Sequence, residues 1–193
     1  TVGLAGETVD GTTTANDAIS GLTTAGATTT SLDVTDVITD VTTTDTDTFT
    51  VVMGANFAGF TDDVGSMTGV EVISLSNDSA VARTFDASNV TGVTTYNVDA
   101  TTGSIAINDA QTVTTLNLSN QASGTMTMTM DVTGDNASTT VATTVAGTAD
   151  SLAFNVTAVG TANSAAATLA SNASAVSLAT SGYETIAVTS AGT

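Results

Sequence analysis

The sequence lacks four residue types on which much of protein chemistry depends. Its 193 residues include no cysteine, no histidine, no proline and no tryptophan. Without cysteine, no disulfide can cross-link the chain. Without cysteine and histidine, the nucleophile pairs of cysteine and serine hydrolases cannot form, and a zinc site would need carboxylates alone. Other groups must therefore stabilise the fold and provide the function.

Positive charge is nearly absent as well. Arg83 is the single basic residue against 19 acidic ones, and the formal net charge is -18. Nucleic-acid phosphates and anionic lipids are both recognised by clustered Lys and Arg, so the composition argues against both partners. The acidic excess repels itself when the chain compacts. Bound divalent cations would relieve that repulsion, whereas the simpler interpretation is that the charge keeps a secreted protein soluble.

The composition also argues against an enzyme. Paired carboxylates can hydrolyse glycosides, but sugar sites usually add aromatic platforms, and aromatic residues make up only 4% of this chain. A polysaccharide lyase would need a cationic group, for which only Arg83 is available. No apolar run approaches the roughly 20 residues of a membrane helix. We therefore expect a protein without catalytic activity and without membrane insertion.

What the sequence does contain is a short phrase that recurs. Two apolar residues flank one polar or small residue, as in Leu116-Asn117-Leu118. A strand sends successive side chains to opposite faces, so this pattern buries one face and exposes the other. The abundant threonine also favours strands, because it is β-branched. The phrase occurs at residues 70–77, 93–100, 113–120 and 183–190, and in a shorter form at 152–157.

The spacing of the apolar pairs predicts the fold class. Several pairs follow one another at steps of roughly 9 to 13 residues, which is typical of short strands in an all-β protein. Like segments that stack indicate a parallel β-helix or β-solenoid, with a β-sandwich as the alternative. The pairs are Ile73/Leu75, Tyr96/Val98, Ile105/Ile107, Leu116/Leu118, Met128/Met130, Phe154/Val156 and Ile186/Val188.

The chain divides softly near residue 68. Residues 1–68 form an acidic entry region rich in Gly, Asp and Thr, and residues 69–193 form the β-repeat region. In the entry region, 34–41 fits either a short helix or a strand pair, and 45–52 alternates like a strand. Residues 53–68 are expected to form a loop with Phe57 and Phe60 turned inward.

Carboxylate and amide oxygens in the entry region and after the first repeated phrase are candidate calcium ligands. Calcium prefers such oxygens, together with backbone carbonyls from Gly-rich turns. Asp45 and Asp47 stand two apart in the expected strand and would share a face. No stretch fits the twelve-residue EF-hand loop. The candidate ligands are Asn16, Asp17, Asp33, Asp36, Asp40, Asp45, Asp47, Asn77 and Asp78.

The recurring phrase resembles units of a known family. Gly69-Val70-Glu71-Val72-Ile73-Ser74-Leu75 is similar to the "G-V-E-T-L-N-L" units of bacterial surface-layer proteins and related large adhesins, and so are residues 92–98 and 182–188. Asn16-Asp17-Ala18-Ile19 is similar to their "G-N-D-x-I" element, and residues 36–49 are similar to "D-V-I-…-T-D-T-L". These proteins are commonly exported by type I secretion and carry RTX-type calcium repeats. The glycines of the calcium-binding nonapeptide are absent here, with Val41-Thr42-Thr43-Thr44 in their place.

The resemblance implies a structural role outside the cell. We expect self-assembly with copies of the same chain into a surface layer or filament, stabilised by Ca²⁺. The start at Thr1, without a signal-like segment, is expected from a processed chain or from a piece of a longer protein. The alternative is an extracellular adhesin or an ice- or carbohydrate-binding segment, for which a cell-surface polysaccharide is a further candidate partner.

Overall fold

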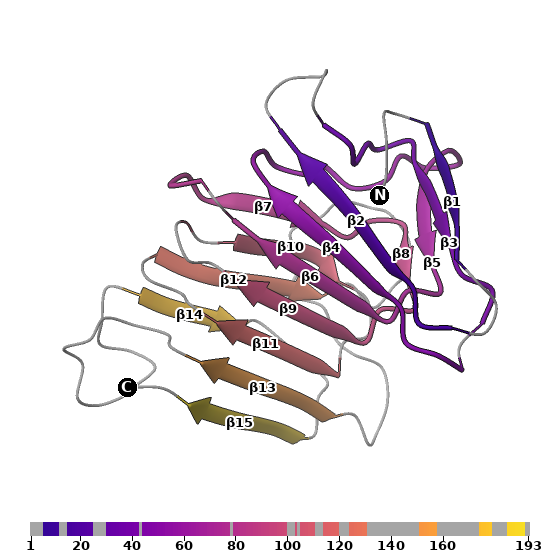
Figure 1. The fold of residues 1–193 in the computed structure, drawn as a ribbon. Helices are drawn as coiled ribbons and strands as arrows, with labels where there is room; N and C mark the ends of the chain where they lie inside the picture. The colour runs from indigo at the N-terminus through magenta and orange to yellow at the C-terminus, as the bar shows by residue number, and fades with distance from the viewer. Residues whose placement is uncertain are drawn as a thin grey trace.

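The computed structural model describes the chain in twelve stretches and is all-β throughout them. Figure 1 shows strands arranged in sheets, with no helix in these stretches, which confirms the predicted all-β class. None of the described stretches contains a helix with the length and apolarity that a membrane span requires. The described residues are 6–11, 15–24, 30–42, 44–77, 79–99, 103, 105–110, 114–119, 124–130, 151–157, 174–178 and 185–191.

The strands form three sheets, which we name A, B and C. Sheet A contains, in spatial order, β1 (Thr8–Asp10), β3 (Val37–Thr39), β5 (Ser66–Thr68) and β8 (Val90–Thr91). Sheet B contains β2 (Ala18–Thr23), β4 (Thr48–Met53), β6 (Val72–Ser76), β9 (Thr95–Asp99), β11 (Thr115–Ser119), β13 (Ser151–Thr157) and β15 (Thr185–Ala191). Sheet C contains β7 (Arg83–Asp86), β10 (Ile105–Ala110), β12 (Gly124–Met130) and β14 (Ser174–Leu178).

Every pair of strands among the described residues is parallel. In sheet B, Ile73 pairs with Phe49 on one side and with Tyr96 on the other. The chain passes from sheet A to sheet B four times, through β1–β2, β3–β4, β5–β6 and β8–β9 (Figure 1). The segments that share the recurring phrase all lie in sheet B, as β6, β9, β11, β13 and β15. Sheet B is continuous across the expected division near residue 68, because β4, which precedes that residue, pairs directly with β6, which follows it.

The hydrophobic core is formed by the inward-facing side chains of these strands. Residues alternate between buried and half-buried along β6 and β9, as the period-two pattern predicts. The predicted inward positions Ile73, Tyr96 and Ile105 are fully buried. Phe57 and Phe60 are also buried, as expected, with their ring centroids 5.0 Å apart in an edge-to-face contact.

Three expectations for the entry region need correction. The loop expected at 53–68 ends in a strand, because Ser66–Thr68 forms β5, which pairs with β3 and β8. The helical alternative for residues 34–41 is wrong, because Val37–Thr39 is a strand that pairs with β1 and β5. These β-branched residues satisfy their backbone groups in the sheet rather than within a helix. The strand expected at 45–52 begins only at Thr48, so Asp45 and Asp47 precede it. Asp47 instead uses its carboxylate to accept the Asp17 N–H at 2.7 Å.

Glycine is required where the chain turns from sheet A into sheet B. Gly69 follows β5 and Gly92 follows β8, with φ of 76° and 95°. Residues with a Cβ rarely adopt this left-handed region. A Cβ on Gly69 would also lie 2.2 Å from the carbonyl oxygen of Asp40. The corner therefore brings consecutive passes of the chain close together, and the candidate site lies beside it.

The outer face of sheet B is polar but almost uncharged. A row of side chains runs across three strands: Asn97 Nδ2 donates to Ser74 Oγ at 3.1 Å, and Asn117 Nδ2 donates to Asn97 Oδ1 at 2.7 Å. Among the described outward positions of β2, β4, β6, β9 and β11, Asp99 is the single charged residue. The others are Ala18, Ser20, Leu22, Thr48, Thr50, Val52, Val72, Ser74, Ser76, Thr95, Asn97, Thr115 and Asn117.

Candidate metal centre

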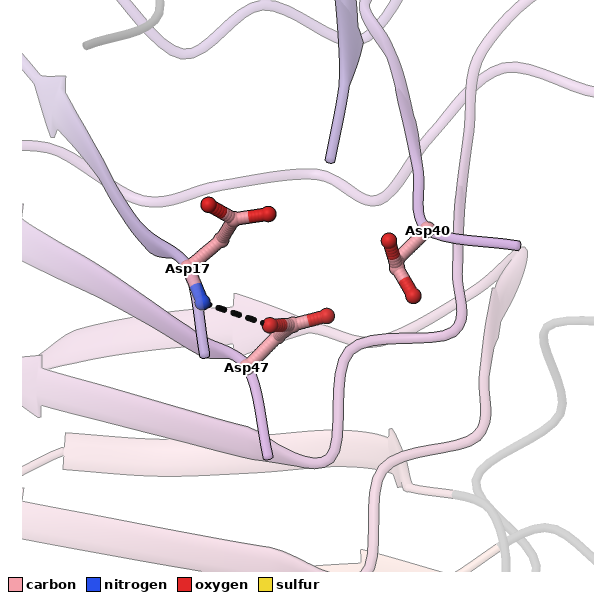
Figure 2. A group of neighbouring side chains, drawn as sticks. All are labelled: Asp17, Asp40 and Asp47. Carbon is pink, nitrogen blue, oxygen red and sulfur yellow. Dashed lines mark hydrogen bonds between the residues drawn. The ribbon is translucent and has the colours of Figure 1, made fainter. Parts of the chain in front are cut away.

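Three aspartates meet at the corner between sheets A and B. Asp17 precedes β2, Asp40 follows β3 and Asp47 precedes β4. One carboxylate oxygen of each lies within 4.8 Å of those of the other two. Figure 2 shows the three carboxylates facing a common space. All three were predicted as ligands from the sequence, and the fold brings them together from positions up to 30 residues apart.

The parallel register of sheet B places Asp17 beside Asp47. Ala18 pairs with Thr48, so the residues that precede them are neighbours. The Asp17 N–H donates to Asp47 Oδ1 at 2.7 Å, drawn as the dashed line in Figure 2. The Thr48 N–H returns a bond to the Asp17 carbonyl at 2.9 Å. The two side chains are thus held at the start of consecutive strands.

Asp40 reaches the same space from the end of β3. Its N–H donates to the Thr68 carbonyl at 2.9 Å, which ties it to β5. Its Oδ2 accepts two bonds from Thr42, one from the N–H at 2.8 Å and one from the hydroxyl at 2.9 Å. These bonds fix the orientation of the carboxylate and leave Oδ1 for another partner. The Thr42 hydroxyl also bonds Asp45 Oδ1.

Two oxygens in the cluster are buried without a partner. Asp40 Oδ1 and Asp47 Oδ2 accept no hydrogen bond, and their residues are only 7% and 0% exposed. Asp45 Oδ2 is also a buried oxygen that accepts no hydrogen bond. A buried carboxylate oxygen without a partner carries a large desolvation cost, so buried charges normally pair or bind metals.

The electrostatic environment makes ionisation of Asp47 costly. Burial raises the pKa of its carboxyl above the usual value, and the bond from the Asp17 N–H opposes this by lowering it. The charges of Asp40, Asp45 and Glu71 raise the pKa further. A positive ion among these groups would offset both the desolvation and the mutual repulsion.

Gly11 lies directly beside the cluster, where a side chain would displace the Asp40 carboxylate. A Cβ at this position would lie 2.7 Å from Asp40 Oδ1 and 3.2 Å from Asp17 Oδ2. The Gly11 N–H donates to the Thr39 carbonyl at 2.7 Å, which holds the backbone there. In the sequence Gly11 is only one of several glycines of the entry region. Its role depends on a contact with Asp40 that no local pattern predicts.

Glu71 is a second residue that sequence reasoning missed. Its Oε2 accepts the Asp47 N–H at 2.9 Å, so it fixes the backbone of a candidate ligand from the next strand of sheet B. Asp47 makes the corresponding bond one strand earlier in sheet B, where its Oδ1 accepts the Asp17 N–H. The strand register would have indicated this relation, but the register is not visible in the sequence.

Four other predicted ligands lie outside the three-carboxylate group: Asn16, Asp33, Asp36 and Asp45. Asn16 is exposed, and its Oδ1 accepts the Thr46 N–H at 3.1 Å. Asp33 Oδ1 accepts the N–H and hydroxyl of Thr35 at 3.0 and 2.7 Å. Asp36 is fully buried, and both of its oxygens accept backbone N–H groups. The named oxygens of Asp33 and Asp36 are thus occupied by hydrogen bonds from Thr35 and from backbone N–H groups.

The remaining two predicted ligands are distant from this corner in the chain. Asn77 is buried at the end of β6, where Nδ2 donates to the Val81 carbonyl at 3.0 Å and Oδ1 accepts the Ser79 N–H at 2.8 Å. It therefore shapes the turn toward β7. Asp78 lies outside the described residues.

The donor set of the cluster is made only of oxygen. Carboxylate oxygens suit hard cations such as Ca²⁺ and Mg²⁺, and the chain has no histidine or cysteine to favour softer metals. The cluster can thus hold one divalent cation and neutralise part of the local charge. No family model, curated protein or solved structure matches the chain, so its function must be inferred from these residues themselves.

Proposed function

We propose that this chain is a structural protein of the cell surface that assembles with copies of itself into a layer or filament, stabilised by Ca²⁺. The observation that carries the proposal is the in-register parallel stacking of strands from successive passes of the chain. Such stacking creates long regular faces rather than a cleft for chemistry. The extracellular location is supported by the acidic composition and by the likeness to surface-layer proteins.

In this proposal the three sheets are the sides of a parallel β-solenoid. The passes β5–β6–β7 and β8–β9–β10 visit sheets A, B and C in the same order. Each pass lies directly on the preceding one, as the pairing of β6 with β9 and of β7 with β10 requires. Each turn buries its apolar row only against its neighbours, so stability comes from stacking.

The outer face of sheet B is the surface on which assembly is proposed to occur. A net charge of -18 opposes contact between most surfaces of two copies. The described outer positions of sheet B carry only Asp99 as a charge, so this face can approach another copy with little repulsion. The Ser74–Asn97–Asn117 row adds regularly spaced hydrogen-bonding groups.

The second candidate function is ligand binding at the same face. A shallow groove of about 140 Å³ lies there and is lined by Thr50, Ser74, Leu75, Ser76, Asn97, Val98 and Asp99. None of the described residues that line this groove has an aromatic ring to stack on a sugar. Aligned threonines would favour ice, but the row of Thr48, Thr95 and Thr115 is interrupted by Val72. Self-assembly is therefore the preferred function.

Electron microscopy of the purified chain tests the proposal. With millimolar Ca²⁺ we expect ordered sheets or filaments, and a strong chelator should dissolve them. Light scattering at matched protein concentrations would follow the same change in solution. A chain that stays monomeric under all calcium conditions would contradict the structural role, and binding to a polysaccharide column would favour the second candidate.

A further inference from the structure

We propose that Asp17, Asp40 and Asp47 form a specific Ca²⁺ site that joins sheet A to sheet B. This inference deepens the calcium part of the proposed function, because it assigns the ion to three residues and one corner of the fold. The ligands come from the segment before β2, the segment after β3 and the segment before β4. One ion would therefore link two consecutive passes of the chain.

The first argument is that the site contains oxygens whose partners are missing. Asp40 Oδ1 and Asp47 Oδ2 are buried and accept no hydrogen bond, while the second oxygen of each is fixed by Thr42 and by the Asp17 N–H. Each carboxylate is thus oriented by one oxygen and presents the other to the shared space (Figure 2). This division of roles is expected of metal ligands, whose orientation is set by surrounding hydrogen bonds.

The second argument is the close approach of Gly11 to the carboxylates of the cluster. A Cβ there would lie within 2.7 Å of Asp40 Oδ1 and 3.2 Å of Asp17 Oδ2. The φ of Gly11 is not among the positive values, so its backbone conformation does not by itself require glycine. Glycine is instead explained by the position of the Asp40 carboxylate, which a side chain at residue 11 would displace from the shared space.

Calcium suits this corner better than magnesium. Ca²⁺ accepts six to eight oxygens at about 2.3–2.6 Å in variable geometry, so it can span oxygens up to about 5 Å apart. The three carboxylate oxygens lie within 4.8 Å of one another and come from three separate segments. Mg²⁺ requires near-octahedral geometry at about 2.1 Å and gives up its water reluctantly. Three carboxylates without an imposed octahedron therefore favour Ca²⁺.

Calcium titration calorimetry on the full chain, first freed of metal by a chelator, tests this assignment. We expect Asp40→Asn and Asp47→Asn each to lose one equivalent of bound Ca²⁺ or to weaken it on the order of 10-fold or more. The matched control is Asp62→Asn, which makes the same charge change at an exposed residue and keeps an oxygen for its bond from Asn89. This control should retain the wild-type stoichiometry and affinity.

Gly11→Ala provides a test that changes no charge. The added methyl group should weaken the same Ca²⁺ equivalent while all three carboxylates remain. If the asparagine variants fail to fold, this variant and the exposed control still decide the question. Unchanged Ca²⁺ stoichiometry and affinity in Gly11→Ala and in every folded asparagine variant would overturn the site. Equal shifts of the wild-type unfolding midpoint by Ca²⁺ and Mg²⁺ would overturn the assignment to calcium.

The same experiments distinguish a failure of the proposed Ca²⁺ site from a failure of the proposed assembly. Titration is done at protein concentrations where light scattering reports only monomer. Loss of the equivalent in the variants, together with assemblies that resist a chelator, would support the site and contradict the calcium dependence of the layer. Retained binding in the variants, with chelator-sensitive assemblies, would overturn the site and leave the layer proposal standing.

Discussion

At the scale of single residues, Asp36 and Asp47 are both fully buried but use their carboxylates differently. Asp36 Oδ1 accepts the N–H groups of Gly6 and Glu7 at 3.0 and 3.1 Å, and Oδ2 accepts the Asp33 N–H at 2.7 Å. Asp47 leaves one oxygen without a partner. Asp36 therefore ties two segments together by accepting their backbone N–H groups, whereas Asp47 presents an oxygen to the candidate metal centre.

Removing the Asp36 carboxylate should destabilise the fold. In Asp36→Ala three backbone N–H groups lose their acceptor, and we expect a loss of about 2 kcal/mol in the free energy of unfolding. Denaturant titration measures it. The control is Asp10→Ala, which removes an exposed carboxylate that accepts one bond from the Thr39 hydroxyl at 2.8 Å. It should cost about 0.5 kcal/mol or less, and equal losses in both variants would contradict the structural role of Asp36.

The protonation of Asp36 gives stability a defined pH dependence. Burial raises the pKa of this carboxyl above 3.8, although the bonds from Asp33, Glu7 and Gly6 lower it in part. Above pH 3.8 the folded state keeps a proton that the unfolded state has released, so stability falls as pH rises through that window.

The contribution of Asp36 to stability can be measured over this pH range. Unfolding free energies from pH 3 to 7 in chelator should show a flatter decline for Asp36→Asn than for the wild type, because the variant has no carboxyl to titrate at this position. The exposed variant Asp10→Asn should keep the wild-type slope. A wild-type slope retained in Asp36→Asn would contradict the assignment.

At the scale of elements, the turns from sheet A to sheet B control how passes of the chain stack. Thr68 pairs with Thr91, so Gly69 and Gly92 follow at equivalent positions. Both adopt positive φ, but their surroundings differ. A Cβ on Gly69 would meet the Asp40 carbonyl oxygen at 2.2 Å, whereas one on Gly92 would meet the Gly69 nitrogen at 3.2 Å.

These differences predict an order of stability for two alanine variants. Gly92→Ala should cost about 1 kcal/mol, since the left-handed conformation is penalised and the 3.2 Å contact with the Gly69 nitrogen needs only a small shift. Gly69→Ala adds a clash with the backbone of Asp40 and should cost more than about 2 kcal/mol. Thermal and denaturant unfolding measure both. The reverse order would show that the corner at Gly69 can relax.

At the scale of the whole molecule, an acidic chain presents one nearly neutral face. Among the described acidic residues, several gather at the corner between sheets A and B, including Asp17, Asp40 and Asp47. The outer face of sheet B between β2 and β11 carries Asp99 alone. This separation allows attraction at one face while repulsion elsewhere limits contacts to it.

A charge placed on that face should prevent assembly without unfolding the chain. Thr50→Glu introduces a carboxylate at an exposed outward position of β4, where a second copy would approach. Thr61→Glu makes the same change at an exposed turn residue outside sheet B. Light scattering and electron microscopy should show assembly lost only in Thr50→Glu, with unchanged circular dichroism in both. Equal assembly in the two variants would exclude this face.

Much of the fold could be predicted from local pattern. The apolar pairs Ile73/Leu75, Tyr96/Val98 and Ile105/Ile107 are in strands and are buried, because a two-residue period allows no other way to separate apolar from polar side chains. The prediction failed near Val37 and Asp45, where helical spacing and strand alternation compete over few residues. At these two places the pairing with neighbouring strands determined the local structure, and a single sequence does not show which strands pair.

The sequence by itself determined that the chain is acidic and has no histidine or cysteine, and it predicted the all-β class of the described residues, since composition and side-chain alternation are local properties. It also contained Asp17, Asp40 and Asp47 among nine candidate ligands. Only the tertiary structure decided which three meet, that Asp36 accepts backbone N–H groups instead, and that Gly11 lies against Asp40 and Asp17. The physical reason is that the parallel register brings together residues about 30 positions apart, and register is set by the packing of whole strands.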